Sequence, residues 1–328
     1  MIRFGIIGAG RIGNVHARSI SQHPDAKLVA ISDPNLEAAE ELGKEYGCAA
    51  VTEAPEIFTN EDIDAVVVCS PTPLHGTHIS EAVKAGKAVL CEKPISMDTA
   101  SVTTLEKDLE EYNPRVMLGF NRRFDPNFAQ IHDLVSKDEI GEVEQLTIIS
   151  RDPAAPPKEY IAVSGGIFKD MTIHDFDMAR FFLGDITEVT AIGQNLDPEL
   201  ADTGDFDAAI IVLKNPAGKV ATIINSRHCA SGYDQRLEAF GPKGSLFAEN
   251  VRPTTVRLSN AKQTNALDPY LDFFLERYED AYFNELDTFI KAIEGEGEFS
   301  PSIADGIAAL KVAEAADESA KTGAPVSL

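Results

Sequence analysis

Residues 2–13 read Ile-Arg-Phe-Gly-Ile-Ile-Gly-Ala-Gly-Arg-Ile-Gly. The short apolar run predicts a strand, and the apolar spacing over Ile12–Gln22 predicts a helix directly after it. Between them, Gly8, Gly10 and Gly13 have the spacing Gly-x-Gly-x-x-Gly. In a nucleotide-binding turn the first glycine allows the bend, the second lets the backbone approach a pyrophosphate, and the third packs helix on strand. A glycine-rich turn without a ligand gives the same pattern, so the flanking sequence has to decide.

Asp33 supplies that context. It lies 20 residues after Gly13, at the end of a second predicted strand, Leu28–Ser32. A carboxylate at this place accepts hydrogen bonds from the ribose of an adenine dinucleotide and repels a 2′-phosphate. The sequence therefore predicts NAD as the cofactor in preference to NADP, and the charge of Arg11 softens that preference.

The alternation of strand and helix continues to Phe120. The Val-rich run Ala65–Cys69 lacks a polar face, as expected of a parallel strand buried on both sides. Two more strands are predicted at Ala88–Cys91 and Val116–Phe120. The predicted helices between the strands are Leu36–Tyr46, His78–Ala85 and Thr99–Tyr112. This order predicts a doubly wound parallel sheet, a Rossmann domain over residues 1–120.

The pattern changes after Asn121. The predicted strands are Val143–Ser150, Thr187–Gly193, Asp207–Leu213, Lys219–Ser226, Gln235–Phe240, Ser245–Ala248 and Thr255–Leu258. The predicted helices are Pro126–Ser136, Asp170–Leu183, Tyr270–Ile293 and Ile303–Thr322. Consecutive strands joined by tight turns favour an open, mostly antiparallel sheet. The chain is thus expected to be α/β, with a second, α+β domain over residues 121–328.

Length and charge agree with this plan. The 328 residues suffice for two domains of about 150 residues each. With 53 acidic and 29 basic side chains the net charge is −24, which disfavours nucleic acids and anionic membranes as partners. The four cysteines form no Cys-x-x-Cys pair, and no apolar run reaches the roughly 18 residues of a membrane span. We expect a cytoplasmic protein that binds a small molecule.

Two polar segments follow predicted strands of the first domain. The carboxyl ends of parallel strands line the ligand crevice of a doubly wound sheet, and Ser70–His75 and Glu92–Pro94 both lie there. Lys93 is placed to stabilise an alkoxide on a substrate, and the alternative for this residue is an ordinary surface lysine. For Ser70–His75 the alternative is a stiff proline turn without a ligand. His75 and His78 are too few ligands for zinc, so no metal is expected.

The segment Gly165–Asp177 is the richest in polar groups. On a continuous helix Asp170, His174 and Asp177 are four and three residues apart, so all three share one face. A carboxylate beside an imidazole orients the ring and favours its protonated form, as a general base requires. An ion-paired surface helix is the plain alternative.

Together with the sequence Gly-Phe-Asn-Arg-Arg-Phe-Asp-Pro at residues 119–126, these motifs resemble the oxidoreductase family typified by glucose–fructose oxidoreductase and inositol dehydrogenase. The resemblance covers essentially the whole chain, and residues 166–181 are most similar to bacterial inositol 2-dehydrogenases. It implies that Lys93, Asp170 and His174 are catalytic. It also implies a Lys93–Pro94 peptide in the cis form and a homotetramer, with a dimer as the alternative.

The resemblance further implies two sets of binding residues. The substrate would be bound by Lys93, Arg123, Asp152, Asp170, His174, Asp177 and Tyr233. The cofactor would be bound by Gly8, Gly10, Arg11, Ile12, Gly13, Asp33, Ser70, Thr72, His75, Glu92 and Lys93. The implied reaction is NAD-dependent oxidation of myo-inositol to its 2-ketone, with His174 as the base. Three alternatives stay open: another inositol isomer or an aldopyranose as substrate, a non-catalytic NAD-sensing regulator, and a lyase or hydrolase that uses NAD transiently.

Overall fold

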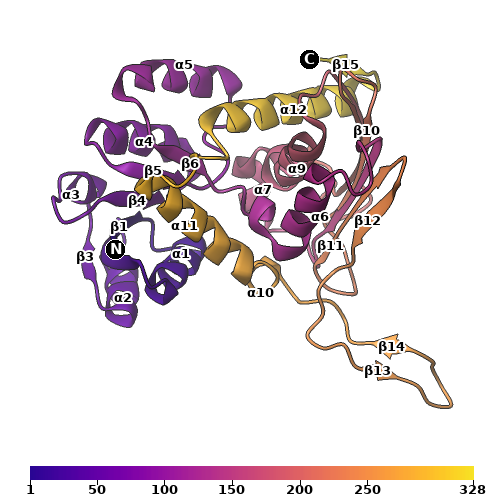
Figure 1. Ribbon diagram of the computed structural model, residues 1–328, viewed down its shortest axis with the longest axis horizontal. Coiled ribbons are helices and arrows are strands. Elements are labelled where there is room, and N and C mark those ends of the chain that lie inside the picture. Colours follow the sequence, from indigo (N-terminus) through magenta and orange to yellow (C-terminus); the bar gives the residue numbers. More distant parts are fainter. The chain divides into compact units, whose positions relative to one another are not determined.

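The computed structural model describes all residues from Met1 to Leu328, and the chain forms two compact units (Figure 1). The first unit consists of Met1–Phe124 and Glu279–Leu310, and the second of Asp125–Tyr278 and Lys311–Leu328. The sequence placed the domain boundary after residue 120, close to the end of the first segment. It did not anticipate that residues 279–310 pack with the N-terminal unit.

The first unit contains a six-stranded parallel sheet in the order β3-β2-β1-β4-β5-β6. Its strands are β1 Ile2–Ile7, β2 Ala26–Ser32, β3 Ala49–Val51, β4 Ala65–Val68, β5 Ala88–Cys91 and β6 Val116–Leu118. Its helices include α1 Arg11–Gln22, α2 Leu36–Tyr46, α3 Ala54–Phe58, α4 His75–Lys84 and α5 Thr99–Leu109. The doubly wound sheet is confirmed, and the order reverses between β1 and β4, where such sheets bind ligands. Only the short β3 and α3 lacked a sequence signal.

The predicted helix Tyr270–Ile293 is wrong in its first part. The structure has a short helix α10, Phe274–Arg277, and a separate helix α11, Glu279–Glu294. Tyr278 between them leaves the helical region, with φ −116° and ψ 19°. α11 buries Leu286, Phe289 and Ile290 in the core of the first unit. This apolar stripe explains why the chain returns there, since burial of about three large side chains stabilises a helix by several kcal/mol.

The second unit is built on a seven-stranded sheet in the order β12-β11-β7-β10-β9-β8-β15. Its strands are β7 Gln145–Arg151, β8 Glu188–Gln194, β9 Ala208–Lys214, β10 Val220–Ser226, β11 Asp234–Gly241, β12 Gly244–Ala248 and β15 Val326–Ser327. Only β7 and β10 pair in parallel, so the expectation of a mostly antiparallel sheet is confirmed.

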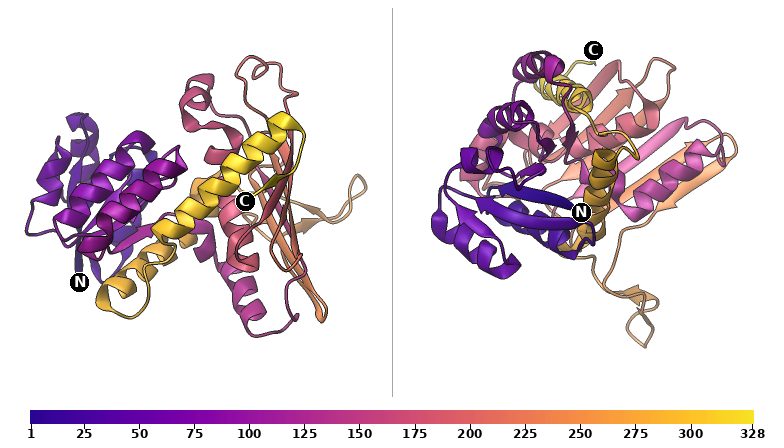
Figure 2. Two further views of the ribbon diagram at one scale, coloured as in Figure 1. Left: turned by 90° about the horizontal axis from the view of Figure 1, so that it is seen from above. Right: turned by 60° about the vertical axis from the view of Figure 1, so that its left-hand side comes forward.

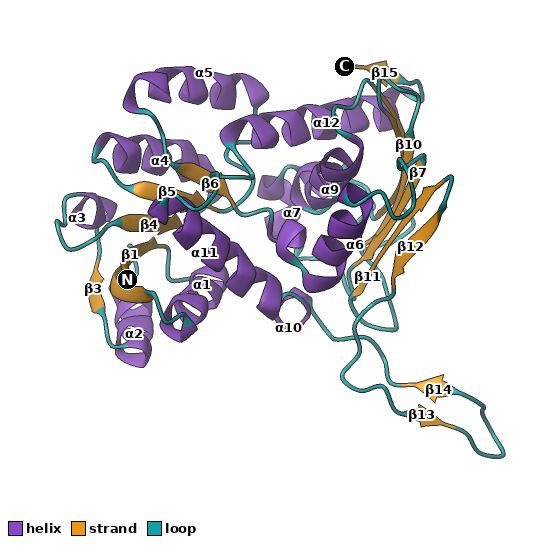
Figure 3. Ribbon diagram, in the orientation of Figure 1, coloured by secondary structure: helices purple, strands orange, loops and turns teal.

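Helices cover one face of this sheet, among them α6 Pro126–Ser136 and the C-terminal part of α12 Ile303–Thr322 (Figure 2). The other face is open. The alternation of the strands places exposed apolar side chains on it, namely Ile192, Ile210, Val212, Phe240 and Phe247. A two-stranded ribbon, β13 Arg257–Leu258 and β14 Ala266–Leu267, extends from the same unit (Figure 3).

The predicted helix Asp170–Leu183 is also wrong, because the structure divides this region into three helices. They are α7 Lys158–Ser164, α8 Gly166–Asp170 and α9 Ile173–Leu183. The break after α8 coincides with Thr172, whose hydroxyl lies 2.7 Å from Asn225 Oδ1, its nearer acceptor, and 3.1 Å from the Ile167 carbonyl oxygen. A buried side-chain bond to a distant strand thus competes with the helical pattern. Asp170 and His174 therefore belong to different helices and share no helical face.

Two further observations concern expectations from composition. All four cysteines are free, and Cys69 and Cys91 are buried, which raises the pKa of both thiols well above the usual value. No helix combines the length and the apolar character needed to cross a bilayer.

Candidate active site

The glycine-rich turn between β1 and α1 fits the backbone of a dinucleotide. A Cβ on Gly8 would lie 2.6 Å from the Cys69 carbonyl oxygen, and one on Gly13 would lie 2.0 Å from the Gly8 oxygen. A Cβ on Gly10 would meet nothing within 4 Å. The fold itself therefore requires the first and third glycines, whereas the second borders open space. The first N–H groups of α1 face that space without a side-chain cap, an arrangement suited to phosphate.

Asp33 is held against this turn. Its Oδ2 accepts a hydrogen bond from the Ala9 N–H at 2.8 Å, and its Oδ1 accepts one from the Asn35 N–H at 2.8 Å. Each carboxylate oxygen has a second lone pair, so the group can still accept from a ribose hydroxyl. The fixed negative charge beside the turn fits NAD and disfavours a 2′-phosphate.

The loop after β4 is fixed by histidines. The His75 ring lies 2.7 Å from the Ser70 carbonyl oxygen through Nε2 and 2.8 Å from the Pro94 oxygen through Nδ1. The Ser70 hydroxyl is 3.0 Å from His78 Nδ1. Burial lowers the pKa of both histidines, and the backbone oxygens beside His75 partly oppose that shift. The two contacts of the His75 ring hold the loop in place. His75 is only 2% exposed, and it joins this loop to the segment after β5. Thr72, another predicted cofactor-binding residue, begins a short 3-10 helix, Thr72–Leu74, in the same loop.

Lys93 follows β5 at the carboxyl edge of the sheet and is partly buried. The peptide between Lys93 and Pro94 is cis. Arg123, at the start of the chain after β6, pairs through Nη2 with Asp305 Oδ1 at 3.1 Å. The structure thus brings Ser70, His75 and Lys93 to one edge of the parallel sheet.

Glu92, the predicted cofactor-binding residue before Lys93, belongs to a buried cluster with His16 and Glu285, two residues that the sequence did not single out. Glu92 Oε1 is 2.8 Å from His16 Nε2. Glu285 on α11 is fully buried, and neither of its carboxyl oxygens has a hydrogen-bond partner. Burial, reinforced by the charge of Glu92, raises the pKa of Glu285 well above its usual value. Burial without a partner therefore favours the protonated, neutral form of Glu285.

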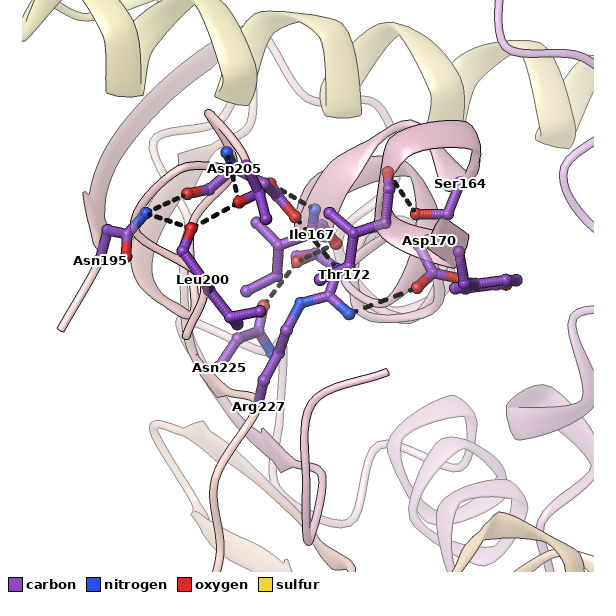
Figure 4. A network of polar contacts seen from close by, with 12 residues as sticks. Ser164, Ile167, Asp170, Thr172, Asn195, Leu200, Asp205, Asn225 and Arg227 are labelled. Carbon is purple, nitrogen blue, oxygen red and sulfur yellow. Dashed lines mark hydrogen bonds and ion pairs between the residues drawn. The ribbon is translucent and has the colours of Figure 1, made fainter. Parts of the chain in front are cut away.

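In the second unit, Asp170 lies in a polar network (Figure 4). Its Oδ2 is 3.6 Å from Arg227 Nη1, and its Oδ1 accepts a hydrogen bond from the Tyr160 hydroxyl at 3.0 Å. Arg227 also pairs through Nη2 with Asp205 Oδ2 at 3.3 Å. The Asp170 carboxylate is therefore held from two sides, by helix α7 and by the end of β10.

The remaining predicted substrate residues of the second unit range from half-buried to fully buried. His174 is in the first turn of α9 and partly buried, and Asp177, one turn later, is 1% exposed. The backbone N–H of Asp152 donates to the Ser226 oxygen at 2.9 Å. Tyr233 is 6% exposed and packs edge-on against Tyr278.

His16, Glu285 and Arg227 were not predicted as site residues, and they differ in how clearly the sequence alone marks them as buried. His16 and Glu285 occupy apolar positions of amphipathic helices, and a polar residue on a buried stripe is a usable signal. Arg227 directly follows β10, and nothing in the local pattern separates it from a surface arginine. Only the fold shows that it is buried.

Two family models match the chain. The model described as "Oxidoreductase family, NAD-binding Rossmann fold" matches residues 2–120, and the "GFO/IDH/MocA C-terminal domain" matches residues 128–247. Residues 2–120 are therefore an NAD-binding Rossmann domain, in agreement with the open space at Gly10 and with Asp33.

Similar proteins extend the match to the full length. The inositol 2-dehydrogenase of Rhizobium meliloti is 47% identical, covering 100% of this chain and 99% of the relative. The crystal structure of a myo-inositol dehydrogenase from Corynebacterium glutamicum is 52% identical with a TM-score of 0.97, covering 100% and 99%. That of scyllo-inositol dehydrogenase from Lactobacillus casei, with bound NAD(H) and scyllo-inositol, is 31% identical with a TM-score of 0.92, covering 100% and 99%. The chain belongs to the GFO/IDH/MocA family of oxidoreductases.

Proposed function

We propose that this protein is an NAD-dependent inositol 2-dehydrogenase that oxidises myo-inositol to 2-keto-myo-inositol. One observation carries the proposal, namely the full-length similarity to proteins of that name at 47% and 52% identity. Two features of the chain support it, namely the glycine-rich dinucleotide turn of the first unit and the presence of Asp170 and His174 at neighbouring ends of α8 and α9 in the second.

In this proposal the acid–base work belongs to three side chains. His174 removes the proton of the substrate hydroxyl, and Asp170 orients the ring and favours the imidazolium that forms. Lys93 stabilises the developing alkoxide as a hydrogen-bond donor. Bound NAD supplies the hydride acceptor. Positioned groups of this kind contribute about two to four orders of magnitude in rate.

The substrate is proposed to be a neutral polyol. Arg123, Asp152, Asp177 and Tyr233 are the further contacts expected from the family resemblance. Carboxylates among them accept hydrogen bonds from hydroxyl groups and repel a phosphorylated or carboxylated ligand. The acidic character of the chain, with its net charge of −24, points the same way.

The second candidate substrate is scyllo-inositol. Proteins named for it are similar to this chain at 34% and 31% identity, below the 47% and 52% of the two relatives that support myo-inositol. The two isomers differ in the configuration of one hydroxyl group, so the activity ratio has to be measured.

The test is NADH formation by the purified protein with a panel of inositol isomers and aldopyranoses. The proposal predicts that myo-inositol gives the highest kcat/KM. A higher value for scyllo-inositol or an aldose would replace the substrate, whereas NAD binding without turnover of any member would favour a sensor. Transient NAD reduction without net NADH would indicate a lyase or hydrolase.

We further propose a homotetramer. The open face of the seven-stranded sheet carries exposed Ile192, Ile210, Val212, Phe240 and Phe247, an apolar patch that assembly would remove from water. Sedimentation equilibrium would give four times the mass of 35.4 kDa, and a mass of two chains would favour the dimer.

A further inference from the structure

Arg227 is a buried charge that the proposed chemistry does not use. Its side chain is 1% exposed, and its backbone N–H donates to the Asp207 oxygen at 2.7 Å. An arginine stays protonated at all accessible pH values, so burial requires anionic partners. The fold meets that requirement with two carboxylates, Asp170 and Asp205.

These two carboxylates bracket helix α8. Asp205 Oδ1 accepts a hydrogen bond from the Ile167 N–H at 3.0 Å, in the first turn of the helix, and Asp170 is its last residue. Arg227 joins both, so one guanidinium fixes the start and the end of a five-residue helix (Figure 4).

The backbone is shaped around Asp205. Gly166 has φ +78°, and a Cβ there would lie 2.7 Å from Asp205 Oδ1. Any larger residue would displace this carboxylate and adopt an unfavourable backbone conformation. The glycine thus leaves room for the acid that binds Arg227.

We propose that Arg227 is a positioning residue for the reaction, which holds the Asp170 carboxylate in the orientation that serves His174. The proposal rests on the proposed function of Asp170 and His174. Tyr160 binds the other oxygen of Asp170 but is 49% exposed, so the buried guanidinium is the stronger constraint. Arg227 acts through Asp170, with Asp205 as its second anchor.

The test compares Arg227→Met and Arg227→Lys with Arg180→Met. Arg180 lies on α9 and pairs with Asp185 at 2.8 Å, outside the network, which makes it a matched control for losing an arginine. For Arg227→Met we expect kcat to fall about 10- to 100-fold, because a small displacement of an orienting group has that cost. The KM for myo-inositol and the dissociation constant of NADH should change within about threefold, and Arg227→Lys should recover part of kcat.

The decisive comparison repeats Arg227→Met in an Asp170→Asn background. If Arg227 acts through Asp170, Arg227→Met adds little to the loss of kcat that Asp170→Asn has already caused. An equal fold-loss in both backgrounds, or a loss no greater than that of Arg180→Met, overturns the proposal. If Arg227→Met does not fold, Asp205→Asn replaces it, since the amide oxygen still accepts from Ile167 while the charge is removed.

Failure of the proposed function would look different. If the wild-type protein oxidises no inositol, thermal unfolding is compared for the wild type, Arg227→Met, Asp170→Asn and the double variant. Coupling between Arg227 and Asp170 in the unfolding midpoints then supports the positioning contact, and additive midpoints overturn it.

Discussion

The two units bury acidic groups in opposite ways. In the first unit, Glu285 lies beside Glu92, which contacts His16, and no arginine or lysine is bonded to Glu285. In the second, Asp170 and Asp205 share the buried guanidinium of Arg227. A buried acid without a fixed cation keeps its proton, whereas an acid beside a permanent cation is held as a carboxylate. The first arrangement links stability to pH, and the second fixes the position of the Asp170 carboxylate.

The largest effect should come from removing the proposed base of the second unit. His174→Ala should lower kcat at least about 100-fold, because a positioned base contributes two to four orders of magnitude. Binding of NADH, measured by fluorescence titration, should stay nearly unchanged. The contrasting variant is Glu285→Gln, which preserves shape and neutrality in the first unit and should keep kcat within about threefold. Near-normal turnover of His174→Ala would refute its role.

The pH dependence of stability should be set in part by the first unit. Glu285 has a raised pKa when folded, so above the unfolded value of about 4.3 the folded state holds a proton that the unfolded state has lost. The free energy of unfolding therefore falls as pH rises, by about 1.4 kcal/mol per pH unit for this one group.

Glu285→Gln should remove that slope and gain stability relative to wild type from pH 5 to pH 8. Urea unfolding at each pH measures the difference between the two proteins. A constant difference across this range would mean that Glu285 is ionised in the fold, against its burial and its lack of partners.

The smallest effect should come from an exposed ion pair. Lys137 Nζ lies 2.6 Å from Asp133 Oδ2 on α6, with both side chains well exposed. Lys137→Ala should change the free energy of unfolding by less than about 0.5 kcal/mol, because water and salt screen such pairs. Urea unfolding measures the change. A loss above about 2 kcal/mol would show that this exposed pair contributes as much to the free energy of unfolding as a buried pair does, which would contradict the distinction between the two.

Local patterns predicted most of the scaffold. The strands β1, β2, β4 and β5 carry continuous apolar runs, and helix α12 carries a long helical period, so each is readable from its own residues. The glycine turn and Asp33 were equally readable, because nucleotide binding depends on residue types at a fixed spacing.

Long-range contacts explain what the patterns missed. The break between α8 and α9 depends on Thr172 bonding to Asn225, 53 residues away. The return of α11 to the first unit depends on a core that its own sequence does not specify. Arg227 could be recognised only from the fold, in which it follows β10 and pairs with both Asp170 and Asp205.

The central claim is hydride transfer from C2 of myo-inositol to NAD, and isotope transfer tests it most directly. The protein would be incubated with NAD and myo-inositol carrying deuterium at C2, and the nicotinamide would be examined by proton NMR. The account predicts deuterium at C4 of the reduced nicotinamide together with a 2-ketone product. Unlabelled NADH from this substrate, or no reduction at all, would contradict it.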